Sequence, residues 1–128
     1  MNRAKMNAVQ PVLPVQDVSA AIAFYVERLG FEHRFQDSRD APHYAGVGRD
    51  AVELHLQWHD PGEWSRVERP MLRFVVPDVQ SLFDEYASQG VFHAHTKLRE
   101  TAWGTREFAF YDPDKNGLTF YADRQQLP

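Results

Sequence analysis

The strongest constraint on the fold of this chain is an internal repeat, in which the pattern of the first half recurs in the second. Asp17-Val18 recurs as Asp78-Val79, 61 positions later, and Gly30 recurs as Gly90, 60 positions later. In each half these residues bound a stretch with apolar residues at helical spacing, where Asp caps the start of the helix and Gly ends it. We therefore predict two structural copies of one unit.

Short segments beside each predicted helix have the composition and alternation typical of strands. Each half then ends in a predicted β-hairpin, and the turns at 48–50 and 112–117 both contain Gly and Asp. The predicted strands outside the hairpins cover residues 12–15, 31–35, 71–76 and 91–95.

Together these elements predict an α+β protein with two βαβββ modules, at residues 8–60 and 70–124, joined by a linker at 61–69. A chain of 128 residues has room for one domain made of both modules. Each module alone leaves a sheet edge and an apolar face exposed, so the modules must pair, either within one chain or by exchange between two chains. We expect a curved mixed sheet that encloses a cup.

Several local motifs resemble those of a known family. They are the Val-x-Asp-Val entry to a helix that ends Phe24-Tyr25-x-x-x-Leu29-Gly30-Phe31, Trp103-Gly104 before a Phe-rich strand, and Asp112-Pro113-Asp114 before the last strand. With the repeat, they resemble the glyoxalase/bleomycin-resistance/extradiol-dioxygenase superfamily (the vicinal oxygen chelate fold), and within it the bleomycin-resistance-protein branch. The resemblance covers about residues 8–124 and implies a homodimer with two cups at or near the interface.

The resemblance also implies where a metal ion would bind, because four positions supply His, Glu or Gln ligands in the metalloenzymes of this superfamily. In this sequence they fall at Gln10, Glu53, Met71 and Thr119. A thioether and a neutral hydroxyl are poor ligands for a divalent ion, and a catalytic site needs three good protein ligands. We therefore expect no metal, no cofactor and no catalytic residues, and interpret the four positions as vestiges of a metal site.

Three histidines are candidates for replacement ligands. His55 shares a strand face with Glu53, and His93 and His95 share a strand face with each other. Lone histidines on strands more often pack or form hydrogen bonds, and no third ligand is visible near the second pair. Packing and surface positions are the favoured interpretation for all three.

Alternation along the strands predicts which side chains face the cup. The uniformly apolar face, which carries Leu13, Leu54 and Phe74, is assigned to the helices. The opposite face is mixed, with aromatic and a few polar groups, as small-molecule sites are. The last hairpin is assigned on the assumption that Phe110 pairs with Thr119. The predicted ligand-binding residues are Tyr44, Glu53, His55, Arg73, Trp103, Phe108, Phe110 and Tyr121.

Two groups within this set have a second interpretation. Glu53 and Arg73 either orient charged groups of a ligand or form a plain ion pair. Trp103, Phe108 and Phe110 either stack on flat parts of a ligand or fill the core or a dimer interface. Their positions in the folded chain distinguish these interpretations.

Composition narrows the class of function. The chain is 13% aromatic, has no Cys and carries a formal net charge of −4, which excludes thiolate chemistry and argues against nucleic acid as a partner. It shows no apolar run of membrane-spanning length and no signal-peptide pattern at its start, so we expect a cytoplasmic protein without a membrane partner.

These observations predict a metal-free protein that binds an aromatic or cationic small molecule, such as an antibiotic or another aromatic natural product. The resemblance implies that it sequesters this ligand, as bleomycin-resistance proteins do, and so confers antibiotic resistance without chemistry. One alternative is a divalent-metal-dependent lyase, isomerase or dioxygenase of the glyoxalase superfamily with atypical ligands. Another is a non-catalytic accessory or sensor protein.

Overall fold

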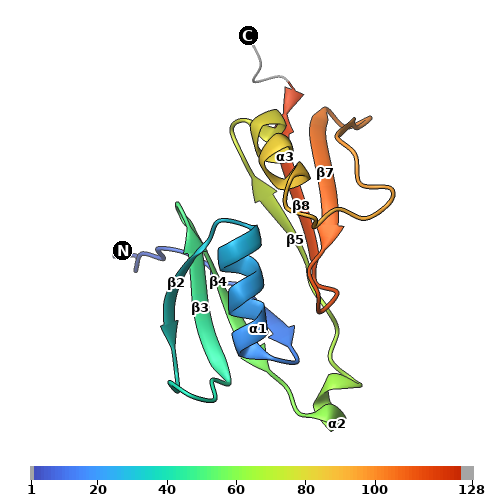
Figure 1. Cartoon of the computed structure of the whole chain (residues 1–128). Coiled ribbons are helices and arrows are strands. Elements are labelled where there is room, and N and C mark those ends of the chain that lie inside the picture. The colour runs from blue at the N-terminus through green and yellow to red at the C-terminus, as the bar shows by residue number, and fades with distance from the viewer. Residues whose placement is uncertain (1, 125–128) are drawn as a thin grey trace.

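The computed structural model describes residues 2–124, which form two sheets that each carry one helix (Figure 1). The first half contains β1 (Val12–Val15), α1 (Val18–Ala23), the π-helical turn η1 (Phe24–Arg28), β2 (Glu32–Gln36), β3 (Tyr44–Arg49) and β4 (Val52–Trp58). The second half contains β5 (Met71–Val75), α3 (Val79–Ala87), β6 (Arg99–Glu100), β7 (Thr105–Tyr111) and β8 (Gly117–Asp123), and the short helix α2 (Pro61–Trp64) lies between the halves.

The two sheets have the same topology. Their strand orders are β1-β4-β3-β2 and β5-β8-β7-β6, so the first strand of each half lies beside the last. In both sheets that contact is parallel and the other contacts are antiparallel. The sequence repeat is therefore a structural repeat, and the predicted α+β fold of two βαβββ units is confirmed.

The helix boundaries follow the predicted signals. The Asp17 side chain accepts a hydrogen bond from the backbone N–H of Ala20 at the start of α1, and Asp78 accepts one from Ser81 at the start of α3. Gly30 and Gly90 have φ values of 76° and 69°, which suit a residue without a side chain. Among the described residues, no helix has the length and apolar character needed to cross a lipid bilayer.

The core lies between each helix and its sheet. Leu13, Leu54 and Leu56 are buried in the first module, and Phe74 and Phe120 are buried in the second, as the alternation predicts. The face of each sheet that points away from its helix is called here its open face. The open faces carry Val12, Arg34, Phe35, Tyr44, Glu53 and His55 on the first sheet, and Met71, Arg73, Val75, Glu107, Tyr111, Thr119 and Tyr121 on the second.

Two tyrosines at equivalent positions of the repeat join the modules. The Tyr25 hydroxyl donates to the carboxylate of Asp112, at 2.7 Å, and the Tyr86 hydroxyl donates to the carbonyl of Leu29, at 2.8 Å. Burial raises the pKa of Tyr25 well above its ordinary value of 10, and it raises the pKa of Tyr86 to about 12. Each module thus receives a hydroxyl from the helical segment of the other.

The open faces remain accessible because the modules meet through helical segments and hairpin turns. On the second sheet Met71 and Val75 are 69% and 71% exposed, and on the first sheet Phe35 is 41% exposed. Figure 1 shows one helix against each sheet. Each open face is therefore an exposed surface rather than a closed cavity.

The register of the last hairpin differs from the prediction by one residue. Thr119 pairs with Ala109 rather than with Phe110, because Tyr111 and Gly117 flank the turn as a pair. A one-residue shift moves every side chain of β7 to the other face. The prediction that Phe108 and Phe110 face the cup is therefore wrong: both are buried in the core, where they pack against Tyr86.

The predicted strand at 91–95 is also wrong. Side chains of this segment, rather than its backbone, make its contacts with β7: the backbone N–H of Tyr111 donates to His93 Nε2 at 2.9 Å, and Thr96 Oγ1 donates to the carbonyl of Ala109 at 3.0 Å. The regular ladder begins only at Arg99. His93 therefore serves as a structural hydrogen-bond acceptor.

Candidate functional site

The open face of the first sheet is shaped by a β-bulge in β2. The register between β2 and β3 shifts between His33 and Phe35, which leaves Arg34 without a partner of its own. As a result, two consecutive side chains, Arg34 and Phe35, lie over the same face. Sequence reasoning missed both residues, because strict alternation sends neighbours to opposite faces.

Two glycines of β3 make room for these side chains. A side-chain carbon at Gly46 would overlap the Phe35 ring, and one at Gly48 would overlap the Arg34 guanidinium. Glycines two residues apart in a strand are a sign that another group approaches the backbone closely. This pattern was the available signal for the two missed residues.

A chain of polar contacts runs beside Phe35. The Tyr44 hydroxyl lies 2.8 Å from His55 Nδ1, and His55 Nε2 lies 2.8 Å from the Glu53 carboxylate. Arg34 donates to the other Glu53 oxygen at 3.3 Å. The hydrogen bond from His55, with a further contribution from Arg34, holds the pKa of Glu53 below its ordinary value. The structure thus brings together three predicted site residues, Tyr44, Glu53 and His55.

Phe35 supplies the exposed aromatic surface of this face. Its ring meets the His55 ring edge-on, with centroids 5.2 Å apart, and stacks near the Tyr44 ring at 6.3 Å. The Tyr44 hydroxyl bonds to His55, and His55 bonds to Glu53, so the two rings that contact Phe35 are held in place. A flat ligand would therefore meet a preorganised aromatic surface.

The open face of the second sheet contains a buried carboxylate. Glu107 is only 4% exposed, and it accepts hydrogen bonds from Arg73 at 3.1 Å and from Thr105 Oγ1 at 2.8 Å. The Arg73 guanidinium also lies over the Tyr121 ring, 4.3 Å from its centroid. Arg99 lies 3.8 Å from the other Glu107 oxygen. The predicted ion pair between Glu53 and Arg73 is not formed, because each residue has a partner on its own sheet.

Two small pockets lie side by side on this second face. One, of about 240 Å³, is bounded by Met71, Tyr111 and Thr119. The other, of about 280 Å³, is bounded by Lys97 and Arg99 and shares Thr119 with the first. The face therefore has an apolar part and a basic part in direct continuity.

Trp103 lies at the end of the second sheet rather than over its centre. It is 65% exposed in the turn between β6 and β7, next to the pair Thr105 and Asp123, which is four residues along β8 from Thr119. The structure places Trp103 at the rim of the face, where it has room to meet a ligand or a partner chain.

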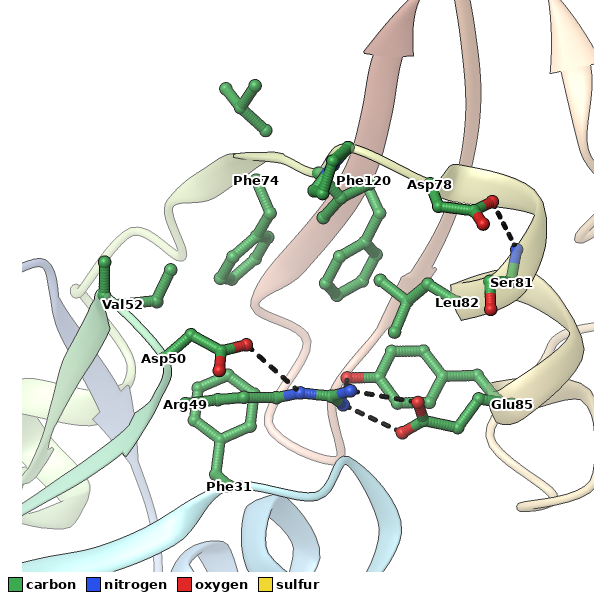
Figure 2. Close-up of a pocket in the computed structure, with 15 residues that line it drawn as sticks. Phe31, Arg49, Asp50, Val52, Phe74, Asp78, Ser81, Leu82, Glu85 and Phe120 are labelled. Atoms are coloured by element: carbon green, nitrogen blue, oxygen red, sulfur yellow. Dashed lines mark hydrogen bonds and ion pairs between the residues drawn. The ribbon is translucent and has the colours of Figure 1, made fainter.

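A larger pocket, of about 370 Å³, lies on the helix side at the junction of the modules. Phe31, Phe74 and Phe120 line it, and Figure 2 shows the Arg49 side chain reaching across it to the carboxylate of Glu85. This ion pair is bidentate, at 2.8 and 2.9 Å, and holds the pKa of Glu85 below its ordinary value. None of the predicted site residues lines this pocket, because it is formed by segments of both modules that sequence reasoning could not bring together.

The residues at the four inferred metal positions do not fit a divalent ion. Glu53 is the one anionic donor, and both of its oxygens already accept hydrogen bonds. Gln10 precedes β1, and Met71 and Thr119 offer a thioether and a hydroxyl. Within residues 2–124, no group of three or more His, Cys, Asp or Glu side chains is placed to hold a metal ion.

Two βαβββ modules with aromatic and polar open faces define a glyoxalase-type ligand-binding fold. The family model of the Glyoxalase/Bleomycin resistance protein/Dioxygenase superfamily matches residues 6–120, and the chain belongs to this superfamily. The resemblance noted in the sequence is thereby confirmed.

The relatives and solved structures that resemble this chain include several binding proteins. A bleomycin resistance protein of Geobacillus stearothermophilus is 29% identical over 127 residues, covering 87% of this chain and 92% of that protein. The crystal structure of the bleomycin-binding protein of Streptomyces verticillus, complexed with copper(II)-bleomycin, is 30% identical, with a TM-score of 0.76 and coverage of 94% and 98%. The bleomycin resistance determinant encoded on transposon Tn5 shares the fold, with a TM-score of 0.77, 22% identity and coverage of 92% and 98%.

Proposed function

We propose that this protein binds a small aromatic compound of the antibiotic type on its open faces and sequesters it without a metal ion and without chemistry. The observation that carries this proposal is the exposed aromatic surface of Phe35, supported by the hydrogen-bonded chain of Tyr44, His55 and Glu53. Such a combination of apolar surface and fixed polar groups is typical of small-molecule sites. The related bleomycin resistance and bleomycin-binding proteins support the same class of ligand.

The aromatic ligand class has more support than the cationic class. An ion pair with a cationic ligand would need a carboxylate with free capacity near the centre of an open face. Glu53 is paired with Arg34 and His55, and Glu107 is buried beneath Arg73, whereas Glu32 lies exposed on the edge strand β2. The rings of Phe35 and Tyr111, in contrast, are 41% and 49% exposed and so present aromatic surface to a ligand.

The alternative of a metal-dependent enzyme has less support, because of the donor chemistry. A catalytic metal needs about three good protein ligands and an open position. Met71 and Thr119 supply neither an imidazole nor a carboxylate, and the oxygens of Glu53 are engaged. The polar chain on the first sheet is better interpreted as support for the Phe35 ring.

A second copy of the chain would complete each cup. Both open faces are exposed within one chain, and β1 and β5 are edge strands with one side free of a neighbouring strand in the described sheets. We propose a homodimer in which the first sheet of one protomer and the second sheet of its partner line a common cup. Apolar side chains such as Val75 would then become buried.

Calorimetric titration tests the proposed function. Bleomycin and a panel of aromatic antibiotics should bind, and Phe35→Ala should weaken binding at least about tenfold. Trp64→Ala is the matched control, because this ring lies on α2 and packs under Arg69, away from the open faces. Removal of divalent ions with EDTA should leave the affinity unchanged. A panel without a binder, or a stoichiometric metal that is required for binding, would contradict the proposal.

A further inference from the structure

The basic part of the second open face has more cationic groups than its carboxylate can pair. Arg73 and Arg99 both approach Glu107, at 3.1 and 3.8 Å, and Lys97 lines a pocket of about 280 Å³ together with Arg99 and Glu107. Glu107 is the one acidic residue among the lining residues of that pocket. Two cations therefore pair with one negative charge, and a third lines the pocket beside it.

The buried carboxylate holds the Arg73 guanidinium by a hydrogen bond and lies within ion-pair distance of Arg99. Glu107 is held from below by Thr105 and is almost fully buried, whereas the side chains of Arg73 and Arg99 are 46% and 59% exposed. A guanidinium has five N–H donors, and Glu107 accepts from Arg73 through one nitrogen, Nη2. The remaining donors of Arg73 are thus available to a ligand on a guanidinium that is already held, which lowers the entropic cost of binding an acceptor.

We infer that Arg73, Lys97 and Arg99 bind an anionic group (a carboxylate, sulfate or phosphate) carried by the compound that the open face takes. Planar guanidinium groups match the oxygen geometry of such anions. The neighbouring pocket bounded by Met71 and Tyr111 would receive the apolar part of the same molecule. This inference rests on the proposed function, and it replaces the expected cationic ligand with an acidic aromatic one.

The test uses three probes at constant ionic strength: naphthalene-2-sulfonate, its neutral analogue naphthalene-2-sulfonamide, and inorganic sulfate. Calorimetry measures the two aromatic probes, and ¹⁵N-resolved shifts of the arginine side chains report sulfate. The sulfonate should bind about tenfold more tightly than the sulfonamide, as expected for hydrogen bonds to a charged group. Sulfate should shift the signals of Arg73 and Arg99.

The variants are chosen to separate local contacts from net charge. Arg99→Gln should reduce sulfonate affinity about tenfold and leave the sulfonamide unaffected. Arg73→Lys, which keeps a charge beside the buried Glu107, should give a smaller loss. Arg106→Gln is the matched control: it removes a charge from β7, the strand beside Arg99, but this guanidinium bonds to Gln80 on the helix side. Equal losses in the Arg106 and Arg99 variants would overturn the inference.

The outcomes distinguish the inference from the proposed function. Equal affinities for the two naphthalene probes would overturn the anion site and leave aromatic binding intact. Sulfate shifts at Arg73 and Arg99 without any aromatic binding would support the anion site and contradict the proposed function. If neither aromatic probe binds and sulfate shifts no arginine signal, both the anion site and the proposed function are overturned.

Discussion

At the scale of single residues, the buried contact between Tyr25 and Asp112 connects the two modules. The Asp112 carboxylate accepts hydrogen bonds from the Tyr25 hydroxyl and from the Asn116 amide, which itself donates to the carbonyl of Pro14. A turn of the second module is thereby bonded to a helix and a strand of the first. Removing one partner from a buried network of this kind leaves another polar group without its hydrogen bond, which is costly.

Tyr25→Phe should lower the free energy of unfolding by about 1–3 kcal/mol, because it removes one donor from a buried carboxylate. The raised pKa of Tyr25 means that its contribution is complete below about pH 10 and is lost as the pH rises beyond that value. Wild-type protein should therefore lose more stability than the variant between pH 9 and 11 in urea unfolding experiments. Tyr111→Phe, at an exposed tyrosine, is the control, and equal alkaline losses would contradict the assignment.

Glu53 gives the opposite dependence on pH. Its pKa is lowered by His55 and Arg34, so its contribution is present above about pH 4.5 and is lost as the pH falls through the lowered pKa. Glu53→Gln should make acid unfolding less steep, as measured by circular dichroism between pH 6 and 3. Glu27→Gln, at an exposed position of η1, should follow the wild-type curve. If both variants unfold alike, the contacts of Glu53 contribute little.

At the scale of elements, the bulge in β2 determines the shape of the first open face. The displaced register brings Phe35 over Gly46, and this contact supplies the exposed ring. Strand alternation predicts one face for each residue, and a bulge is the usual way in which a strand departs from it.

Gly46→Ala should displace the Phe35 ring and weaken binding of aromatic ligands. We expect the added methyl group to lower the free energy of unfolding by about 1–3 kcal/mol. We also expect the affinity for aromatic ligands to fall, because the displaced Phe35 ring no longer meets the ligand. Gly62→Ala is the control, since its added carbon meets only the Asp60 carboxylate, at 3.2 Å. Unchanged affinity in Gly46→Ala would show that Phe35 does not contact the ligand.

The elements also show how much the sequence could predict. Capping Asp and terminal Gly residues act locally, so α1 and α3 were predictable, as was the repeat that relates them. The register of β7 against β8 depends on how the five-residue turn 112–116 closes between Tyr111 and Gly117, and composition does not determine that closure. Likewise, no pattern in the sequence shows that the His93 side chain, rather than a backbone carbonyl, accepts the hydrogen bond from the backbone N–H of Tyr111. The predicted placement of Tyr44, Glu53 and His55 on one face depended on alternation alone, and the structure brings these residues together.

At the scale of the whole molecule, the exposed apolar side chains of the open faces predict association. The protein should sediment as a dimer of its 14.8 kDa chain. Val75→Glu, at an edge strand where the side chain is 71% exposed, should shift the equilibrium to monomer without unfolding the chain. Ala87→Glu adds the same charge at an exposed position of α3, on the helix side of the sheet, and should leave the dimer intact. A wild-type monomer at all concentrations in analytical ultracentrifugation would contradict the paired arrangement.

The outward direction of both open faces has a genetic consequence. If each cup combines faces from two protomers, a chain damaged at Phe35 and a chain damaged at Arg99 can rescue one another. In a mixed dimer the two lesions would fall together in one cup and leave the other whole, although neither parent binds well alone. Co-expression of two defective alleles would then restore drug binding, a complementation that is impossible if each chain encloses its own ligand.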